Sequence, residues 1–336
     1  MRPISKVTGT PHNRILITGG AGFIGHHVVE HFLATTDCEV VSLDRIDTSC
    51  NLGRLHLLLE ENPQWRARLH IVWHDLKAPI NDYVATQIGP IKGILHLAAG
   101  SHVDRSVKNP LQFVLDNVVG TTNLLEYVRL RLPDLEVFLN FSTDEVFGPA
   151  VEGITFAEDD RHNPCNPYSA SKSAAEQICN AYCVTYNIPV ITTHTMNVYG
   201  IRQNNEKFIP LVINKLRNKE TVFVHTDKEG TIGARKYLHV KDVARALVLL
   251  LEKGVIGEKY NISSDVEVDN LSLAQEIATL MDCELDYELE YPEKTRGVND
   301  IRYSISGTKI RVLGWAPSLS IRDGLRGVIE WYLGND

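Results

Sequence analysis

The sequence lacks the cysteine patterns and long apolar runs that mark disulfide-rich, zinc-binding and membrane proteins. Its six cysteines have no C-x-x-C spacing, so we expect reduced thiols and no metal site. They are Cys38, Cys50, Cys165, Cys179, Cys183 and Cys283. The longest strongly apolar run, around 246–251, is far shorter than the ~20 residues that span a bilayer, and the chain opens without an apolar signal core. We therefore expect a cytoplasmic protein with no membrane partner.

An excess of positive charge is also missing. The formal net charge is −8 and no basic block interrupts it, which argues against general binding to nucleic acid or to anionic membranes. Low-complexity segments and repeats of fixed period are not found either, so most of the chain after about residue 12 should be folded. The 336 residues suffice for two hydrophobic cores, because single cores stop growing at about 250 to 300 residues.

Short apolar runs alternate with helix-like stretches over the first two hundred residues. This alternation predicts an α/β fold with a Rossmann-type, doubly wound parallel sheet. The strands are expected at 14–18, 39–43, 70–73, 93–97, 137–141 and 189–193, and the helices at 23–33, 53–61, 109–131 and 168–187.

The pattern changes after Asn197, where polar loops, a helix near 207–218 and a charged segment at 225–236 interrupt the alternation. A strand and helix at 237–253 and a strand at 259–262 then return to the first pattern. We therefore expect a discontinuous division. Residues 13–196 and 237–264 form the Rossmann domain, and residues 197–236 and 265–336 form a smaller α/β substrate-binding domain.

A glycine-rich turn joins the first expected strand to the first helix. Gly19, Gly22 and Gly25 recur at three-residue intervals, with Phe23 and Ile24 between the last two. Such a turn lets the backbone approach a pyrophosphate, to which the helix N-terminus offers N–H groups and partial positive charge. An ordinary glycine-rich turn is the alternative, but the flanking strand and helix favour a dinucleotide site.

An acidic residue ends the next strand. Asp44 lies 19 positions past Gly25, close to the ~20 at which a carboxylate accepts hydrogen bonds from the adenosine ribose. A carboxylate there repels a 2′-phosphate and favours NAD over NADP, whereas the adjacent Arg45 is able to hold that phosphate. We expect NAD. Asp75 and Leu76, after the third strand, are either adenine contacts or an ordinary strand end.

Tyr168 and Lys172 are four residues apart in a helix-forming stretch, so their side chains share a face. An ammonium near a phenol favours the phenolate, which would let a tyrosine of ordinary pKa ~10 act as a base near neutral pH. Such a pair is also common on solvated helix faces. Ser142 and Thr143 follow the strand at 137–141, at the carboxyl edge of the sheet where ligands bind.

The glycine turn and the Y-x-x-x-K pair together resemble the extended short-chain dehydrogenase/reductases, from about Arg14 to the C-terminus. This resemblance implies that Ser142 or Thr143 assists Tyr168 and that Ala98 and Ala99 pass along the NAD. It also implies a homodimer, with the helices at 109–131 and 168–187 at the interface.

A narrower resemblance rests on Ser142-Thr143-Asp144-Glu145-Val146-Phe147-Gly148. With the segments 101–106, 197–200 and 206–210, it is similar to the nucleotide-sugar 4,6-dehydratases, most of all those of the dTDP-glucose type. Two carboxylates after a strand are otherwise solvated loop charge. Related epimerases and decarboxylases normally lack the Asp-Glu pair.

The dehydratase resemblance implies a role for each of five residues, Lys172 supporting the tyrosine. Tyr168 removes the proton of the sugar 4-hydroxyl while hydride passes from C4 to NAD, and Thr143 hydrogen-bonds at the C4 oxygen. Glu145 takes the C5 proton and Asp144 protonates the departing 6-hydroxyl, after which the hydride returns to C6. Asp144 must then be protonated, which predicts a raised pKa from burial and from the neighbouring Glu145.

The substrate would be a nucleoside-diphosphate hexose, and arginine forks suit its phosphates. By resemblance, Lys207 and Arg235 are better candidates than Arg296 and Arg302, although all four are also readable as surface charges. Further substrate candidates are Ser101, His102, Asn197 and Asn299, and Asn197 is a cofactor candidate as well. Asn299 replaces a usual histidine, Phe147 a usual tyrosine, and the 225–236 loop is longer than usual, so dTDP-glucose, UDP-glucose and UDP-N-acetylglucosamine all remain open.

Two other functions stay open. A nucleotide-sugar epimerase or decarboxylase of the same fold would use Tyr168 and NAD but leave the carboxylates idle. A non-enzymatic NAD sensor would keep the glycine turn, but such a protein has no need of both Tyr168 and Lys172, and this chain has both.

Overall fold

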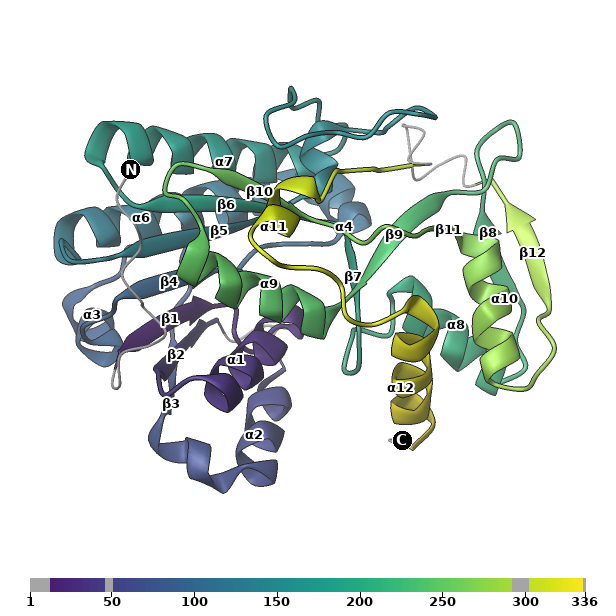
Figure 1. The fold of residues 1–336 in the computed structure, drawn as a ribbon, viewed down its shortest axis with the longest axis horizontal. Coiled ribbons are helices and arrows are strands. Elements are labelled where there is room, and N and C mark those ends of the chain that lie inside the picture. Colours follow the sequence, from purple (N-terminus) through teal and green to yellow (C-terminus); the bar gives the residue numbers. More distant parts are fainter. Residues whose placement is uncertain (1–12, 46–50, 292–301, 335–336) are drawn as a thin grey trace.

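The computed structural model describes residues 13–45, 51–291 and 302–334. Its centre is a sheet of seven parallel strands in the order β10-β6-β5-β4-β1-β2-β3 (Figure 1). The strands are β1 (Arg14–Thr18), β2 (Glu39–Asp44), β3 (Leu69–Trp73), β4 (Gly93–His96), β5 (Val137–Thr143), β6 (Val190–Thr195) and β10 (Lys259–Ile262). The order reverses between β1 and β4, as in dinucleotide-binding sheets, and confirms the predicted Rossmann-type fold.

Alternating side chains of the strands build a core on each face of the sheet. In β1, Ile15 and Ile17 belong to one core and Leu16 to the other. The first core is covered by α1 (Phe23–Thr35), α2 (Leu52–Glu61) and α9 (Val240–Lys253), and the second by α3 (Asp82–Ile88), α6 (Gly120–Arg131) and α7 (Pro167–Tyr186). The sheet is thus doubly wound, as predicted.

The helix expected at 109–131 is a succession of three pieces. α5 (Pro110–Phe113) leads into a π-helix, η2 (Val114–Val119), and then into α6. The sequence did not predict the short helix α4 (Val103–Lys108), nor η1 (Pro63–Ala67) and η3 (Asp144–Phe147). The strand expected at 137–141 continues to Thr143, because Ser142 and Thr143 still pair with β6.

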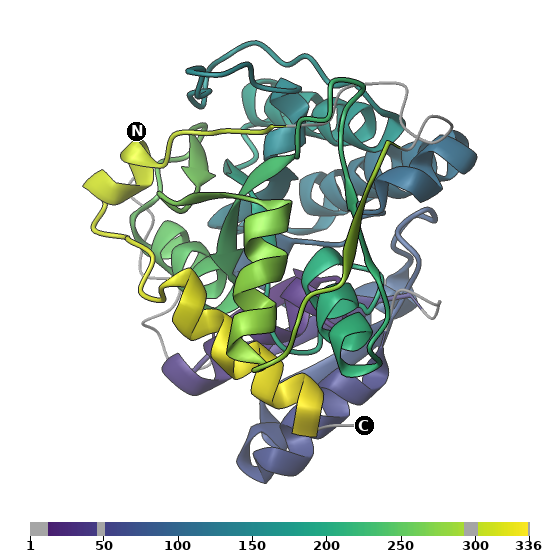
Figure 2. The ribbon, with the colours of Figure 1, turned by 90° about the vertical axis from the view of Figure 1, so that its right-hand side faces the viewer.

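Segments between Tyr199 and Tyr332 build a separate apolar core, and its three helices face the viewer in Figure 2. It packs α8 (Phe208–Arg217), α10 (Asn270–Leu280) and α12 (Ile321–Gly334) against two small sheets, β11-β9-β7 and β12-β8. These strands are β7 (Asn197–Tyr199), β8 (Val222–His225), β9 (Ala234–His239), β11 (Glu267–Asp269) and β12 (Tyr287–Glu290). α11 (Thr308–Val312) packs near β10. The exact division into two domains stays a prediction.

Four of the small-sheet strands, β7, β8, β11 and β12, were not predicted, and β9 begins inside the segment expected to be a charged loop. Each of the four is only three or four residues long and pairs with a strand distant in sequence, so local periodicity could not reveal it.

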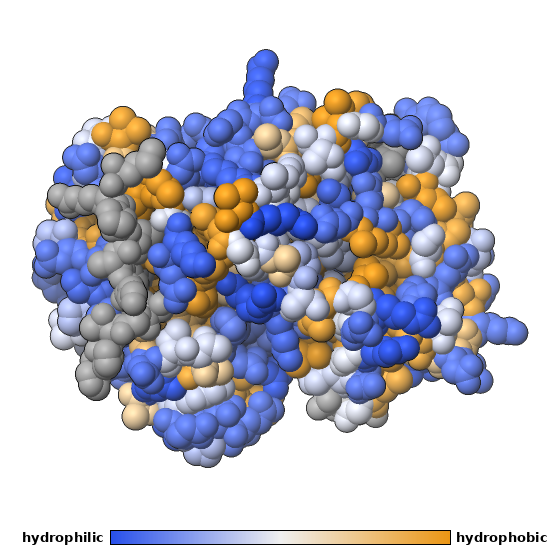
Figure 3. Space-filling view, viewed as in Figure 1, coloured by the Kyte–Doolittle hydropathy of each residue, from blue (hydrophilic) through white to orange (hydrophobic). Residues whose placement is uncertain are grey.

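On the face shown in Figure 3, hydrophobic residues form separate groups among hydrophilic ones. No helix within the described residues is long and apolar enough to cross a membrane.

Candidate active site

The glycine turn between β1 and α1 packs too closely for side chains. A Cβ on Gly25 would lie 2.0 Å from the carbonyl oxygen of Gly19, and one on Gly19, whose φ is +74°, would lie 2.9 Å from the backbone of Ala98. Gly22 is the N-cap of α1 and has no side chain to accept hydrogen bonds from its first turn. The backbone N–H groups of this helix end therefore face the cavity that the turn lines, as an anion site requires.

A cavity runs from the glycine turn along the carboxyl ends of the strands to α7. Most of the predicted cofactor residues line this cavity. Two of the substrate candidates, Ser101 and Lys207, line it as well. The predicted cofactor residues along its wall are Gly19, Gly22, Phe23, Ile24, Gly25, Asp44, Asp75, Leu76, Ala98, Ala99, Ser142, Tyr168 and Lys172. Asn197 is not among the lining residues. The tight turn, the helix end and Asp44 fit NAD, so these residues would hold its pyrophosphate and ribose.

Asp44 and Arg45 were opposite indications for the choice between NAD and NADP. Asp44 is buried at the end of β2, where its carboxylate accepts hydrogen bonds from the backbone N–H of Ala21 (3.0 Å) and from Ser42 Oγ (2.7 Å). Arg45 donates two hydrogen bonds to the carboxylate of Asp116, and its Nη1 lies 3.9 Å from Asp75 Oδ2. A 2′-phosphate would have to compete with two carboxylates for Arg45, which favours NAD.

Sequence reasoning missed Gln203, Asn204 and Asp116, which also line the cavity. Gln203 and Asn204 come from the segment after β7, which Arg54 of α2 ties to the glycine turn. Its guanidinium donates to Asn204 Oδ1 at 2.8 Å and to the carbonyl of Ala21 at 3.3 Å. No local motif marks these residues, because only the packing of three distant segments brings them to the cavity.

Tyr168 and Lys172 both lie in the first turns of α7 and are buried. Lys172 Nζ donates to the carbonyl of Phe141 at 2.6 Å, and burial lowers the pKa of Lys172 to about 8. In the chain by itself, Lys172 does not lower the pKa of Tyr168 as the pairing of the two residues predicted. Burial, and secondarily the charge of Glu145, raise the pKa of Tyr168 well above its ordinary value, while a hydrogen bond with Thr143 opposes the rise.

The predicted Thr143, Asp144 and Glu145 lie beside this phenol. Thr143 is the last residue of β5 and caps η3, and its hydroxyl lies 3.2 Å from Asp144 Oδ1. Asp144 is buried and Glu145 is half-buried, and the charges of both act on Tyr168. Glu145 Oε2 accepts a hydrogen bond from Asn166 Nδ2 at 3.1 Å. The structure thus brings a phenol, a hydroxyl and two carboxyl groups together.

Ser142 was predicted to assist at the same place. Its hydroxyl is buried, lines the cavity and has no hydrogen-bond partner among the described residues. A buried hydroxyl normally finds a partner, so its position fits a contact with a bound molecule.

The remaining substrate candidates lie at different places relative to the cavity. His102 caps α4, and its Nε2 lies 3.6 Å from Glu206. Asn197 contacts the hydroxyl of Tyr237, and the guanidinium of Arg235 stacks over the ring of Tyr303 at 5.1 Å, both away from the lining of the cavity. Arg302, another candidate for binding phosphate, forms a bidentate ion pair with Glu267. Asn299 and Arg296 lie outside the described residues.

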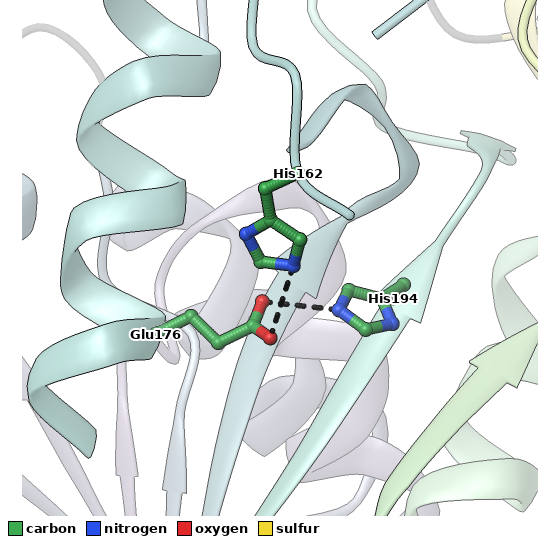
Figure 4. A group of neighbouring side chains, drawn as sticks. All are labelled: His162, Glu176 and His194. Atoms are coloured by element: carbon green, nitrogen blue, oxygen red, sulfur yellow. Dashed lines mark hydrogen bonds and ion pairs between the residues drawn. The ribbon is translucent and has the colours of Figure 1, made fainter. Parts of the chain in front are cut away.

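A group of ionisable side chains that the sequence did not predict lies behind Lys172, one helical turn further along α7. Glu176 meets the Nε2 atoms of His162 (3.4 Å) and His194 (3.0 Å) from two sides (Figure 4). Lys259 Nζ lies only 2.9 Å from the same carboxylate and supplies the positive charge that a cation would bring. We therefore interpret the group as an ion-pair network that joins α7 to β6 and β10, and not as a metal site.

Aromatic contacts also join this ion-pair network to η3, the segment that carries Asp144 and Glu145. The ring of Phe147, at the end of η3, packs edge-on against His162 and His194, at centroid distances of 5.4 and 4.8 Å. The segment that carries Asp144 and Glu145 is thereby fixed against the helix that carries Tyr168.

Comparisons with known proteins agree with this geometry. Residues 16–328 match the family model described as GDP-mannose 4,6 dehydratase. The chain is 38% identical to the low-salt glycan biosynthesis protein Agl12 of Haloferax volcanii, over 96% of this chain and 99% of that protein. It is 37% identical to a dTDP-glucose 4,6-dehydratase of Neisseria gonorrhoeae, over 96% of each chain.

A solved structure is also similar over nearly the whole chain. It is that of DesIV, a dTDP-glucose 4,6-dehydratase from Streptomyces venezuelae, with NAD and dTDP bound. The TM-score is 0.86 at 32% identity, over 96% of this chain and 97% of that one.

Proposed function

The chain belongs to the GDP-mannose 4,6-dehydratase family of extended short-chain dehydrogenase/reductases, and on that premise we propose that it dehydrates a nucleoside-diphosphate hexose to its 4-keto-6-deoxy sugar, with NAD as bound cofactor. The relatives support the reaction class, since they carry the name dehydratase at 35 to 37% identity over most of the chain. The reaction is a lyase reaction in outcome, although it proceeds through oxidation and reduction.

One observation of the site carries the proposal. Thr143, Asp144 and Glu145 follow one another at the end of β5, and Glu145 Oε2 accepts a hydrogen bond from Asn166, which stands two residues before Tyr168 at the start of α7. An epimerase or a decarboxylase of this fold needs the tyrosine but has no use for two carboxyl groups at this position. Elimination of water, by contrast, needs a base and an acid close to the group that oxidises the substrate.

The chain's own residues can perform the proton transfers in order. Tyr168 removes the proton of the 4-hydroxyl, and the carbonyl that forms at C4 makes the hydrogen on C5 acidic. Glu145 removes the C5 proton while Asp144 protonates the leaving 6-hydroxyl, and Glu145 gives the proton back to C5 once the hydride has reached C6. Thr143 donates to the C4 oxygen. When NAD is bound, it would supply the redox chemistry, which is the transfer of a hydride from C4 and back to C6. Lys172 lies one helical turn after Tyr168 on α7, and the carbonyl of Phe141 accepts a hydrogen bond from its ammonium.

The substrate side supports a diphosphate but not one particular nucleotide. Lys207 lies at the cavity wall at the start of α8 and remains close enough to Glu145 to interact with its charge. Ser101, His102, Asn197, Arg235 and Asn299 complete our proposed substrate set. Both dTDP-glucose and UDP-glucose remain candidates, as does UDP-N-acetylglucosamine.

A turnover assay tests the proposal directly. The purified protein is incubated with dTDP-glucose, UDP-glucose and UDP-N-acetylglucosamine, and the products are identified by mass and by the absorbance of the 4-ketone. Loss of one water from any of these substrates supports dehydration. A product of unchanged mass with an inverted hydroxyl, or release of carbon dioxide from a uronic acid substrate, would replace the proposal by an epimerase or a decarboxylase. If none of the nucleotide sugars reacts, the non-enzymatic NAD sensor is the function that remains.

The variant Glu145→Gln separates oxidation from elimination. We expect oxidation at C4 to persist and elimination to slow by about 10²- to 10⁴-fold, the range for loss of a general base. Reduced cofactor should then accumulate, which absorbance at the NADH band measures. Glu152→Gln, at an exposed position in the loop after η3, is the control and should behave as the wild type. Loss of oxidation with normal elimination would contradict the roles assigned to Tyr168 and Glu145.

We also propose a cytoplasmic homodimer that pairs through α6 and α7. Apolar side chains are exposed on these helices and on the neighbouring segment, where water contact is unfavourable. They are Val107, Leu111, Val114, Leu130, Val184 and Tyr186. The buried thiol of Cys179 suits a reducing compartment. A molar mass in solution equal to one chain would contradict the dimer.

A further inference from the structure

The proposed function requires two adjacent carboxyl groups to have opposite roles, one as a base and one as an acid. Glu145 has to be ionised to accept a proton, and Asp144 has to be protonated to donate one. Like charges this close raise each other's proton affinity, so proximity alone does not decide which carboxyl keeps its proton. The surrounding contacts have to decide it.

Asn166 contacts Glu145 and also begins the helix that carries Tyr168. Its Oδ1 accepts a hydrogen bond from the backbone N–H of Ser169 at 2.8 Å and so caps α7. Its Nδ2 donates to Glu145 Oε2 at 3.1 Å. Because the cap occupies the oxygen of the amide, the amide is oriented with its N–H₂ end toward the carboxylate.

Asp144 is in a different environment. It is 4% exposed, whereas Glu145 is half-buried, and the hydroxyl of Thr143 lies 3.2 Å from its Oδ1. Burial favours the neutral form of a carboxyl group, and an amide donor favours the charged form. Asp144 accepts a hydrogen bond from the Thr143 hydroxyl and Glu145 accepts one from the Asn166 amide, so the deeper burial of Asp144 is the difference that favours its neutral form.

We propose that Asn166 is a positioning residue that selects Glu145 as the base, because its amide fixes the Glu145 carboxylate and favours its ionised form while the same amide caps the helix of Tyr168. The inference rests on the proposed dehydration for its catalytic meaning. The hydrogen bond itself is independent of the substrate.

Other titratable groups also face Glu145 and set the background for this effect. They are Asp144 in the same turn, the phenol of Tyr168 on α7 and the ammonium of Lys207 at the start of α8. Behind Lys207, Glu206 pairs with Arg105 of α4 at 2.8 Å. None of these groups is changed by a substitution at Asn166, so their contributions are common to all variants.

Two substitutions isolate the amide donor. Asn166→Ser and Asn166→Asp both keep a good N-cap for α7. Serine removes the donor to Glu145, and aspartate replaces the donor by a second carboxylate. Asn166→Ala removes the donor and the cap together, so the difference between its thermal midpoint and that of Asn166→Ser shows the effect of capping.

The first measurement is the pH profile of turnover by the NAD-loaded protein. Loss of the donor favours the protonated carboxyl, so the acidic limb should move to higher pH by about 0.5 to 1 unit in Asn166→Ser and further in Asn166→Asp. Reduced cofactor should accumulate in the steady state, because oxidation continues while elimination slows by about 3- to 10-fold at the original optimum. An unchanged acidic limb in both variants would overturn the proposal, and so would equal loss of oxidation and elimination.

A second measurement needs no turnover. In protein labelled with ¹³C at the glutamate carboxyl groups, the resonance that Glu145→Gln removes is followed against pH. Its midpoint should be higher by the same amount in Asn166→Ser than in the wild type, and an identical midpoint would contradict the inference. If the wild type dehydrates no nucleotide sugar, the proposed function fails on its own assay while this titration still decides the role of Asn166.

Discussion

The two ends of the cavity differ in how closely sequence and structure agree. At the cofactor end, the glycine turn, Asp44, Tyr168 and Lys172 all lie where the motifs predicted. At the substrate end, Lys207 lines the cavity, Arg235 stacks on Tyr303 and Arg302 pairs with Glu267. The difference teaches that a site built from one turn and one helix is encoded locally, whereas a site built between two cores is encoded by packing.

The physical cause is the distance along the chain between the contributing residues. Gly19 and Gly25 are six residues apart and their contact is fixed by a single turn. Beside Lys207, Arg105 reaches Glu206 across 101 positions, and no pattern in either segment predicts the contact. Perturbing each end of the cavity tests whether the contrast holds for function as well.

The largest effect is expected at the glycine turn. In Gly25→Ala the new Cβ would lie 2.0 Å from the Gly19 carbonyl, a backbone atom that cannot move aside. We expect overpacking of about 3 kcal/mol or more and a loss of NAD affinity of about 100-fold, measured by calorimetric titration. Gly327→Ala in α12 is the matched control, because its Cβ meets nothing within 4 Å. The control should bind NAD normally and gain up to about 1 kcal/mol in stability. Normal NAD binding by Gly25→Ala would refute the assignment of the turn.

A smaller effect is expected at the substrate end. Burial lowers the pKa of Lys207, but the lysine still lines the cavity as a potential diphosphate contact. Lys207→Met keeps the length of the stem and should raise KM for the nucleotide sugar by about 10-fold, with NAD binding unchanged. Lys241→Met, at an exposed position in the first turn of α9, serves as the control.

The same kinetics also test the alternative role of this lysine. A fall in kcat without a change in KM would show that Lys207 acts on Glu145 instead of on the diphosphate. Arg235→Met, measured in parallel, shows whether a cation outside the cavity lining still contributes to substrate binding.

The smallest effect is expected beneath the cofactor end. His96 is buried between the hydroxyls of Thr18 and Thr121, at 2.8 Å from each, and burial lowers its pKa to about 3. Because the unfolded chain takes up this proton near pH 6.5, stability is complete above that pH and is lost as the pH falls from 6.5 toward 3. The slope is at most about 1.4 kcal/mol per pH unit. Urea unfolding between pH 5 and 7 measures it.

The control for this prediction is a neutral substitution of similar polarity. His96→Gln should flatten the slope by up to that amount, even if the variant is less stable at every pH. An identical slope in the variant would show that other buried histidines, such as His26 and His239, carry the acid sensitivity.

Much of the fold could be predicted from the sequence because the large sheet is built from separate strand and helix units. The strands of that sheet are marked by apolar runs, whereas their order was not predicted and comes from the structure. The small sheets could not be predicted, because β7, β8, β11 and β12 are too short to show a period and pair with distant segments. The candidate catalytic residue types followed from motifs, but the direction of the Tyr168 pKa did not, since it depends on burial and on the charge of Glu145 beside the phenol.

The sequence by itself determined the candidate residues for the chemistry. They are the glycine turn, Tyr168 and Lys172 one helical turn apart, and the Asp144-Glu145 pair after a strand. Only the tertiary structure decided how these residues are set against each other. It buries Asp144, brings Asn166 to Glu145 and holds Phe147 against His162 and His194. The reason is that residue types and short spacings are local properties. Burial and hydrogen-bond direction exist only after β5, α7 and the loop between them have packed together.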